Sequence, residues 1–370
     1  MKNILFVHSS SEMYGSDRSL LNIVKQINKD EFNVYVVLPC PGPLVDAMRE
    51  IPKVNVEVFE VAVLRRKNLS IKGGIQYIKE FCGSYNYLKK FIKKCKIDIV
   101  DTNTAVVFPG AIAAKHAKIK SVWHIREIIK SNLENTVISF IMNRYADVVI
   151  ANSKATGVAL KVNQKKVKVV YNAVEESADV IPIEHEDFVV GMAGRINRWK
   201  GQKLLTDVAE IVCKTYPNTK FYIAGEAYMG EEYLKEELIN YIASKKLSDN
   251  VILLGQVNDM SSFYKSLDVF ALPSTQPEPF GLVVIEAMEY GLPVVATNHG
   301  GPTEIVSEGQ DGFLVDYNGP EEMAERIMRL IADAELCKTM GAKGQMKKRQ
   351  VFSVAEMVRS IENIFREVVC

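Results

Sequence analysis

The chain lacks the long apolar segments that mark membrane-spanning and secreted proteins. No apolar run approaches the ~18 residues that a membrane span needs. The N-terminal run at 4–7 is followed by His8 and three serines, which is not the pattern of a signal peptide. We therefore expect a cytoplasmic protein, held at the inner face of a membrane only if some other feature attaches it.

The chain also has few of the residues that build metal centres and disulfide frameworks. Its six cysteines show no CxxC pair and no metal-like spacing, and its five histidines are scattered. This pattern predicts reduced thiols. No G-x-G-x-x-G fingerprint and no Walker A sequence occurs, which argues against the usual dinucleotide and P-loop sites. The cysteines are Cys40, Cys82, Cys95, Cys213, Cys337 and Cys370.

The net charge of +1 hides two halves of opposite sign. Residues 1–180 carry 27 Lys and Arg against 17 Asp and Glu, whereas residues 181–370 carry 19 against 28. The basic half is therefore a candidate for an anionic partner. Nucleic acid is not the expected partner, because no recognised nucleic-acid motif accompanies the charge.

Segment 61–96 concentrates the basic charge. It holds ten basic residues against one acidic residue, Glu80, and apolar residues recur in it at roughly helical spacing. The pattern is typical of a basic amphipathic helix on an anionic membrane surface. It fits equally well a helix that packs by its apolar stripe and leaves its lysines solvated, so both interpretations stay open. The apolar residues are Phe81, Tyr85, Leu88, Phe91 and Ile92, and the basic ones are Arg65, Arg66, Lys67, Lys72, Lys79, Lys89, Lys90, Lys93, Lys94 and Lys96.

Short apolar strands alternate with helical stretches along the chain. This alternation predicts α/β domains with parallel sheets, whose ligands lie at the carboxyl ends of the strands. The first helix is expected to run to about Lys29, and residues from about Glu321 to Cys370 to be helical. The strands are expected at 1–7, 33–38, 54–59, 97–101, 121–124, 148–151 and 167–170, and then at 188–192, 220–224, 251–254 and 269–272.

A chain of 370 residues exceeds one typical hydrophobic core, so two domains are expected. The stretch 175–187 is acidic, contains Pro182 and shows no periodicity, which is typical of a linker. We therefore predict one domain over 1–178 and a second over 187–351.

The stretch 272–295 combines a strand end, a loop and a short helix in one phosphate-handling unit. The helix is predicted to begin near Gly281 and to end before Gly291 and Pro293. Its N-terminus offers backbone N–H groups and a positive dipole end to a phosphate. Glu286, about one turn into the helix, could accept two hydrogen bonds from a ribose diol, and Glu278, on the loop, could do the same for a second sugar.

These two glutamates, inside EPFGLVVIEAMEYGLPVVAT and followed by GGPTEIVSEGQDGFLV, resemble the donor-site signature of family 4 glycosyltransferases. The resemblance implies the GT-B fold: two Rossmann-like doubly wound domains that face each other across a cleft. It also implies a final helix, about 352–370, that packs back onto the first domain. The match is strongest over 188–317 and weaker in the first domain, where such enzymes choose their acceptors.

The loop 193–201 (AGRINRWKG) resembles the Gly-Arg…Lys-Gly pattern of the family. Arg195 can bind phosphate oxygens with its planar fork, and Lys200 acts as a point charge. Together they would stabilise the departing nucleoside diphosphate. The resemblance implies that Arg195, Lys200, Glu278 and His124 are catalytic. The expected donor-binding residues are Gly15, Val257, Phe280, Gly281, Leu282 and Glu286.

In the first domain, WHIRE resembles the site of the family histidine that faces the donor sugar, and this role is carried onto His124. The family loop Gly-Gly-x-Glu-Arg reads Tyr14-Gly15-Ser16-Asp17-Arg18 here. Gly15 keeps the place where backbone approaches a phosphate or an acceptor hydroxyl. Tyr14 and Asp17 depart from the family residues and are candidates for the acceptor side.

The resemblance implies a glycosyltransferase that moves a sugar from a nucleoside diphosphate sugar to a glycan acceptor with retention of configuration. A lipid-linked glycan of cell-surface polysaccharide or lipopolysaccharide is the expected acceptor. No Asp-x-Asp pair occurs, so the metal-binding carboxylate motif common in sugar-nucleotide enzymes is missing. We expect no cofactor and no metal, since Arg195, Lys200 and the helix N-terminus at Gly281 can replace the cation. The alternatives are a sugar-nucleotide epimerase on the same fold and a non-catalytic nucleotide-binding subunit of a glycan-assembly complex.

Overall fold

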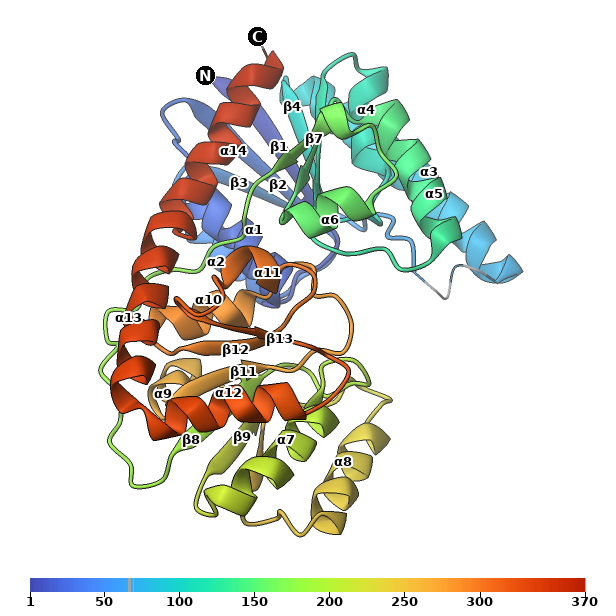
Figure 1. The fold of residues 1–370 in the computed structure, drawn as a ribbon. Helices are drawn as coiled ribbons and strands as arrows, with labels where there is room; N and C mark the ends of the chain where they lie inside the picture. The colour runs from blue at the N-terminus through green and yellow to red at the C-terminus, as the bar shows by residue number, and fades with distance from the viewer. Residues whose placement is uncertain (66–67, 69, 370) are drawn as a thin grey trace. The chain divides into compact units, whose positions relative to one another are not determined.

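The computed structural model describes residues 1–65, 68 and 70–369, which form two compact units (Figure 1). Unit 1 comprises Met1–Ala173 and Val354–Cys370, and unit 2 comprises Val174–Ser353. Each unit is built on one sheet, and every strand pairing recorded for the two sheets is parallel. The predicted α/β fold with two Rossmann-like domains is confirmed.

The sheet of unit 1 has its first strand near the centre. The strand order is β3-β2-β1-β4-β5-β6-β7, so the chain winds outward from β1 in both directions. Residues 4–7 of β1 form an unbroken apolar run that is buried throughout, which shows that both sides of the sheet are covered. The strands are β1 (Lys2–His8), β2 (Phe32–Leu38), β3 (Val54–Val58), β4 (Ile99–Asn103), β5 (Lys120–Ile125), β6 (Val148–Ala151) and β7 (Val167–Val169).

Two groups of helices bury the faces of this sheet. On one face Ile4 and Phe6 of β1 pack with α1, α2 and α14, although α14 comes from the other end of the chain. On the opposite face Leu5 and Val7 pack with α3 and α4. The helices of unit 1 are α1 (Gly15–Gln26), α2 (Pro43–Arg49), α3 (Ile71–Lys94), α4 (Pro109–His116), α5 (Asn132–Tyr145), α6 (Lys154–Ala159), η2 (Gln164–Lys166) and α14 (Val354–Val369).

Unit 2 repeats the doubly wound plan with the order β10-β9-β8-β11-β12-β13. Apolar residues of α7, α8 and α12 form its main core with the sheet, and α10 packs on β11 and β12 and against α13. The strands are β8 (Val189–Ala193), β9 (Lys220–Ala224), β10 (Val251–Gly255), β11 (Val269–Leu272), β12 (Val294–Thr297) and β13 (Gly312–Val315). The helices are α7 (Gln202–Thr215), α8 (Tyr233–Ser244), α9 (Met260–Lys265), α10 (Leu282–Glu289), α11 (Pro302–Ile305), α12 (Glu321–Ala332) and α13 (Ala334–Val351).

The predicted strands agree with the observed ones apart from small shifts at their ends, but the first helix is shorter than predicted. The first helix ends at Gln26, because the backbone of Ile27 leaves the helical conformation with ψ 138°, and the Lys29 ammonium then donates to the carbonyl of Val24 at 2.8 Å. The C-terminal stretch from Glu321 is helical as predicted and is divided into three helices, the last of which is α14 (Val354–Val369). Asp333 ends α12 and starts α13 by accepting the N–H of Leu336 at 2.9 Å. Cys370 lies outside the described residues.

The stretch predicted as a linker, 175–187, contains no helix or strand and belongs to unit 2. The N–H of Ser177 donates to Glu289 at 3.0 Å, and Asp179 pairs with Lys265 at 2.6 Å. The acidic composition of this stretch therefore serves contacts along unit 2. The chain crosses between the units at 173–174 and 353–354, where the sequence analysis had placed the domain ends at 178, 187 and 351.

Candidate functional site

A buried ion pair stands beside the loop that leads from β11 to α10. Lys200 Nζ lies 2.5 Å from Glu278 Oε1, and only 17% and 5% of the two side chains are exposed. The hydroxyl of Ser274 donates to the same carboxylate oxygen at 2.7 Å. The ring of Trp199 lies under the Lys200 ammonium at 4.7 Å. Two residues that the sequence analysis selected separately are thus direct partners.

Close backbone contacts hold the loop that carries Lys200 against the loop that carries Glu278. Gly201 has φ 84°, and a Cβ on it would come 1.8 Å from the carbonyl oxygen of Pro273. The N–H of Thr275 donates to the Trp199 carbonyl at 2.8 Å. The glycine that follows Lys200 is required here, because any side chain would push the loop of Lys200 away from the loop of Glu278.

A second close approach lies on the other side of the Glu278 loop. Gly300 has φ 69°, and a Cβ on it would come 2.3 Å from the carbonyl oxygen of Glu278. A Cβ on Gly301 would come 2.3 Å from the Cα of Phe280. The Gly-Gly pair therefore lets the chain after β12 press against the backbone of 278–280. Phe280 itself is buried and packs edge-on against Phe352, so its side chain serves packing in this unit.

The N-terminus of α10 begins as the sequence predicts. Gly281 is the N-cap with φ 99°, and no side chain caps the helix start. The first residue of the helix is Leu282, which is half-buried. Backbone N–H groups in the first turn of a helix lack intrahelical partners and suit an anion.

Glu286 lies half-buried on α10 and has a partner that the sequence analysis missed. The hydroxyl of Tyr264 donates to Glu286 Oε2 at 2.7 Å. Tyr264 is buried and stacks on Tyr290 with ring centroids 5.3 Å apart. This stacking holds the Tyr264 hydroxyl against Glu286 and restricts its rotamers.

The two predicted cations differ in their surroundings. Unlike Lys200, Arg195 is exposed, and its guanidinium lies 5.3 Å from the ring of Tyr228. Val257 lies half-buried in the turn after β10. Arg195 follows β8 and Val257 follows β10, two strands of one sheet with β9 between them, and both residues stand beyond the carboxyl ends, where ligands bind in doubly wound domains.

His299 is a further residue beside the ion pair that the sequence analysis missed. Its Nε2 lies 2.7 Å from the carbonyl oxygen of Ser274, the residue whose hydroxyl also contacts Glu278. Its ring stacks on Tyr317 with centroids 4.7 Å apart and planes 4° apart. The carbonyl can only accept, so Nε2 carries the proton.

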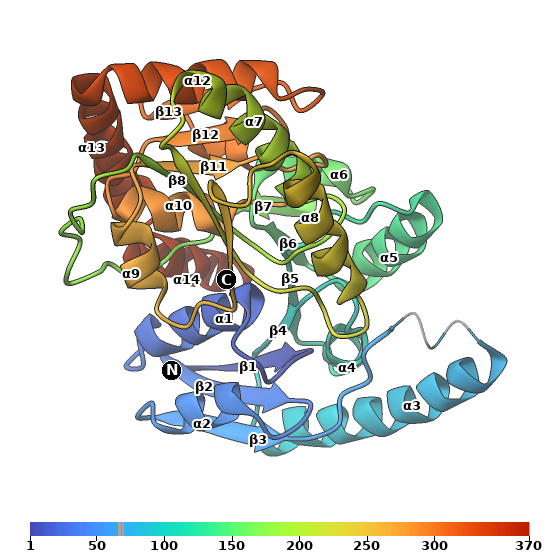
Figure 2. The ribbon, with the colours of Figure 1, turned by 90° about the horizontal axis from the view of Figure 1, so that it is seen from below.

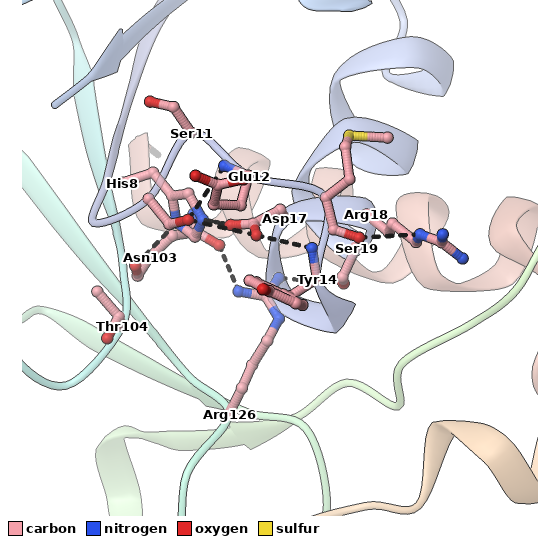
Figure 3. Close-up of polar contacts among 12 residues, drawn as sticks. His8, Ser11, Glu12, Tyr14, Asp17, Arg18, Ser19, Asn103, Thr104 and Arg126 are labelled. Carbon is pink, nitrogen blue, oxygen red and sulfur yellow. Dashed lines mark hydrogen bonds and ion pairs between the residues drawn. The ribbon is translucent and has the colours of Figure 1, made fainter. Parts of the chain in front are cut away.

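Unit 1 has a polar row across three neighbouring strands. In the register of the sheet, His8 of β1 stands beside Asn103 of β4, and Asn103 stands beside His124 of β5. All three residues are buried. The row lies at the carboxyl ends of these strands and is covered by α1, which contributes Asp17 (Figure 3).

Both ring nitrogens of His8 face oxygen atoms that act as acceptors. Nδ1 lies 3.1 Å from the carbonyl oxygen of Asn103, and Nε2 lies 2.7 Å from Asp17 Oδ1 (Figure 3). The other oxygen of Asp17 accepts the backbone N–H of Tyr14 at 2.9 Å and the Ser10 hydroxyl at 3.3 Å. Because the carboxylate is used as an acceptor on all sides, the geometry is that of an imidazolium paired with a carboxylate.

The predicted acceptor-side residues Asp17 and Tyr14 lie in very different surroundings. Asp17 is fully buried and is enclosed by His8, Ser10 and the backbone of Tyr14. Tyr14 is 59% exposed, as is suitable for contact with another molecule. Gly15 is the first residue of α1, directly after the Tyr14 N-cap.

Arg126 belongs to the same cluster as Asn103 and Ser19 (Figure 3). Its guanidinium donates to Asn103 Oδ1 at 2.5 Å and to the Ser19 hydroxyl at 3.2 Å. Burial lowers the pKa of Arg126 to about 10, against the opposing effect of Asp101. Burial also raises the pKa of Asp101 to about 7, while Asn103 donates to its carboxylate at 2.7 Å.

His124 is held neutral by this environment. Its pKa lies well below the ordinary value, first because the ring is buried and then because Arg126 and His8 are positive. Its Nδ1 is buried without a hydrogen-bond partner. A neutral imidazole with an unused ring nitrogen can exchange a hydrogen bond with a hydroxyl without carrying charge.

The sequence analysis missed His8, Asp101, Asn103 and Arg126. The sequence does contain a signal for these residues, since each stands at or near the end of a buried strand. Polar residues in such positions meet at one edge of a sheet when their strands are adjacent. The strand order was needed to see that β1, β4 and β5 are neighbours. No short motif joins these positions along the chain.

The packing of α3 decides between the two interpretations of the basic segment 61–96. The apolar stripe of α3 faces the protein, with Leu88, Phe91 and Ile92 buried and Tyr85 and Phe81 partly buried. The membrane-facing interpretation of this stripe is therefore wrong, and the alternative of a packed helix with solvated lysines describes it. Arg66 and Lys67 lie outside the described residues.

The described part of the chain contains neither a membrane-spanning helix nor a metal-binding cluster of side chains. Within residues 1–65, 68 and 70–369, no helix is both long and apolar enough to cross a membrane. Over the same residues, no group of three or more His, Cys, Asp or Glu side chains is placed to hold a metal ion.

Known families and proteins resemble this chain over most of its length. The family model of glycosyl transferases group 1 matches residues 173–347, and that of glycosyltransferase family 4 matches residues 13–178. An uncharacterized glycosyltransferase of Methanocaldococcus jannaschii is 28% identical over 94% of this chain and 93% of its own length. The Escherichia coli UDP-Gal:alpha-D-GlcNAc-diphosphoundecaprenol alpha-1,3-galactosyltransferase is 25% identical over 96% of this chain and 94% of its own length.

A solved structure agrees with these relatives. HepE of Anabaena, crystallised with UDP and glucose, is 28% identical and superposes with a TM-score of 0.83 over 99% of this chain and 100% of its own. The resemblance that the sequence analysis drew from residues 188–317 is thereby confirmed. The chain belongs to the family 4 glycosyltransferases of the GT-B fold, enzymes that transfer sugars from nucleotide donors.

Proposed function

We propose that this glycosyltransferase moves a sugar from a uridine diphosphate sugar to a lipid-linked glycan, as a step in the assembly of a cell-surface polysaccharide or lipopolysaccharide. The solved HepE structures hold UDP, UDP-glucose, or UDP with glucose, which supports a UDP sugar as the donor. The name of the Escherichia coli relative specifies a diphosphoundecaprenol-linked acceptor, which supports a polyprenyl diphosphate glycan here. We place the reaction at the cytoplasmic face of the membrane, where such an acceptor is reached.

The buried Lys200–Glu278 pair next to the start of α10 is the observation that carries this proposal. The donor diphosphate binds between the Lys200 ammonium, the exposed guanidinium of Arg195 and the backbone N–H groups at Gly281 and Leu282. Ser274 and Lys200 both engage Glu278 Oε1, so Oε2 remains to accept from a sugar hydroxyl. Lys200 thus links the diphosphate to the residue that binds the sugar.

The nucleoside is held further along α10. Glu286, whose Oε2 accepts from the Tyr264 hydroxyl, also accepts from the ribose hydroxyls. Backbone groups near Val257 contact the base, and Phe280 acts through its backbone because its side chain is buried. His124, kept neutral by burial, bonds a hydroxyl of the donor sugar, and the backbone at Gly15 approaches the phosphates.

The proposed mechanism depends on the negative charge that develops on the leaving diphosphate. As the bond from the anomeric carbon to the diphosphate oxygen breaks, negative charge grows on the diphosphate, and Arg195 and Lys200 stabilise it without a metal ion. The departing phosphate takes the proton from the acceptor hydroxyl. That hydroxyl forms its bond on the face that the diphosphate leaves, so the configuration is retained. Tyr14 meets the acceptor, and Asp17 positions Tyr14 through its backbone N–H.

The test is transfer from a panel of UDP sugars to a polyprenyl diphosphate glycan with EDTA present. We expect one UDP sugar to be consumed only with the acceptor, and proton NMR of the product to show the anomeric configuration of the donor. Strict dependence on a divalent metal contradicts the metal-free mechanism, and an inverted product contradicts retention. A changed UDP sugar without acceptor indicates the epimerase, and UDP binding without turnover indicates the non-catalytic subunit.

A further inference from the structure

The segment that follows β9 stands between the ends of two other strands, β8 and β10. On one side the N–H of Ile196, after β8, donates to the carbonyl of Glu226 at 3.0 Å. On the other side the N–H of Gly225 donates to the carbonyl of Gly255, the last residue of β10, at 2.7 Å. Glu226 is thereby fixed at the middle of three neighbouring strand ends, at the edge of the sheet where ligands bind in doubly wound domains.

The carboxylate of Glu226 lies over the end of β10. A Cβ on Gly255 would come 2.8 Å from Glu226 Oε1, so the glycine leaves the room that the carboxylate occupies. Gly255 also has φ 67°, which a residue with a side chain rarely adopts. Val257, whose backbone is assigned to the base of the donor, follows two residues later. The Glu226 carboxylate is therefore held close to the segment that meets the base.

Lys235 gives this carboxylate a cationic neighbour. Its Nζ donates to Glu226 Oε1 at 2.6 Å. Lys235 stands in the first turn of α8, the helix that lies beside α7 in both views of the chain (Figure 1, Figure 2). The side chains of Lys235 and Glu226 are 35% and 36% exposed, so a ligand can reach both of them. The pair thus offers a hydrogen-bond acceptor and a donor side by side.

This combination of donor and acceptor matches uracil better than the other bases. The pairing edge of uracil carries one ring N–H with a carbonyl oxygen on each side, so a carboxylate can accept from the N–H while an ammonium donates to either oxygen. The pair therefore fits uracil whichever way round it meets the edge. Cytosine, adenine and guanine offer a donor beside an acceptor in only one order along that edge. A polar site rejects an analogue that leaves its own groups unpaired.

We propose that Glu226 and Lys235 read the base of the nucleotide donor and select uracil. The Glu226 carboxylate accepts the ring N–H, and the Lys235 ammonium donates to a neighbouring carbonyl oxygen of the base. The inference rests on the proposed function in one respect, the position of the nucleotide along the strand ends of unit 2. It deepens that function by naming the side chains that choose the base.

The test is the affinity of the full chain for nucleoside diphosphates, measured by isothermal titration calorimetry with EDTA present. UDP should bind about tenfold or more tightly than CDP, ADP and GDP, because a hydrogen bond to a charged group is lost with the wrong base. The diphosphate of 3-methyluridine, in which a methyl group replaces the ring proton, should lose affinity to the same extent. A wild-type chain that does not bind UDP, or binds CDP or the methylated nucleotide as tightly, overturns the proposal.

Glu226→Leu separates base reading from a structural role. The variant should bind UDP about tenfold or more weakly and bind the methylated nucleotide as the wild type does, so the preference for UDP disappears. Inorganic pyrophosphate, which has no base, should bind the variant and the wild type alike. A variant that loses affinity for all these ligands in the same proportion has a disturbed loop, and that result overturns the proposal, as does an unchanged preference.

Two further variants sharpen the assignment. Glu226→Gln keeps an oxygen that can accept from the ring N–H, so it should retain more of the preference for UDP than Glu226→Leu. The matched control is Glu210→Leu, because Glu210 pairs with Lys245 at 2.7 Å and the two side chains are 37% and 28% exposed. That pair joins α7 to the C-terminal end of α8, away from the strand ends, and its loss should leave every affinity unchanged. Equal effects of Glu210→Leu and Glu226→Leu overturn the proposal.

The two proposals fail separately. Sugar transfer from a UDP sugar, with a base preference that Glu226→Leu does not alter, refutes the base-reading pair and leaves the proposed function. A preference for UDP that Glu226→Leu abolishes, in a chain that transfers no sugar to any acceptor, refutes the proposed function and leaves the base-reading pair.

Discussion

The two units share one architecture but build their polar edges in different ways. In unit 2 the candidate groups stand on loops, and glycines let two loops touch so that Lys200 and Glu278 meet across 78 positions of sequence. In unit 1 the groups stand in or beside the sheet, where the register places His8, Asn103 and His124 in a row. The difference teaches that a loop-built site leaves a sequence motif, whereas a register-built site leaves scattered residues.

Removing the Lys200 ammonium from unit 2 should give the largest effect and the sharpest contrast with unit 1. Lys200→Ala should lower turnover about 10²–10³-fold, the usual effect of losing one group that stabilises transition-state charge. Affinity for free uridine should change far less, because the partner of Lys200 is the diphosphate. The matched control is Arg198→Ala in the same loop, where Arg198 is exposed and pairs with Glu237 at 3.6 Å. Equal losses of turnover in both variants would refute a specific role for Lys200.

Unit 1 should respond to the loss of its buried pair in stability and not in donor binding. His8→Leu leaves the buried Asp17 carboxylate without its charged partner, which should lower the free energy of unfolding by ~3 kcal/mol. The double variant His8→Leu/Asp17→Asn should recover part of this loss, since no charge is then left unpaired. Urea unfolding measures both. A thermal shift by UDP that disappears in the double variant would break the comparison, because Lys200, Arg195 and Glu286, which are assigned the main contacts with UDP, stand in unit 2.

The ribose contact should give a smaller, purely binding effect. Glu286→Ala removes charge-assisted hydrogen bonds worth ~1.5–3 kcal/mol each, so the dissociation constant for UDP should rise at least about tenfold. Tyr264→Phe keeps the carboxylate and removes only its tyrosine partner, so UDP should bind that variant at least as well as the wild type. Isothermal titration calorimetry with UDP measures the dissociation constants of both variants. Unchanged affinity in Glu286→Ala would refute the assignment.

The smallest expected effect is a pH dependence of the free energy of unfolding that comes from Asp101 in unit 1. The pKa of Asp101 in the folded protein, about 7, lies above its ordinary value of 3.8. Between these values the folded state holds a proton that the unfolded chain has lost. The stability that Asp101 contributes is therefore complete at low pH and falls as the pH rises, by at most ~1.4 kcal/mol per pH unit.

Asp101→Asn tests this dependence, because Asn keeps the acceptor for Asn103 and does not titrate. The wild type should gain stability relative to the variant when urea unfolding is repeated at about pH 5 instead of about pH 8. His124 and Arg126 are present in both proteins, so their own titration largely cancels in the difference. A difference that does not vary with pH would show that Asp101 is charged throughout.

Prediction from the sequence succeeded where the signal is local. The strands were found from short apolar runs, and the start of α10 at Gly281 from a glycine ahead of an apolar stretch. It failed where segments far apart in the chain decided the outcome. The apolar stripe of α3 faces the core because α4 and the sheet offer a surface there.

The sequence by itself determined the α/β class, the strand positions, the family and the residues of the donor loops. These depend on periodicity, on turn residues and on contiguous motifs, all of which lie within a few residues of one another. Only the tertiary structure decided that Lys200 pairs with Glu278 and that Asp17 is buried against His8. Such facts depend on strand register and on the approach of segments far apart in the chain, which no local pattern encodes.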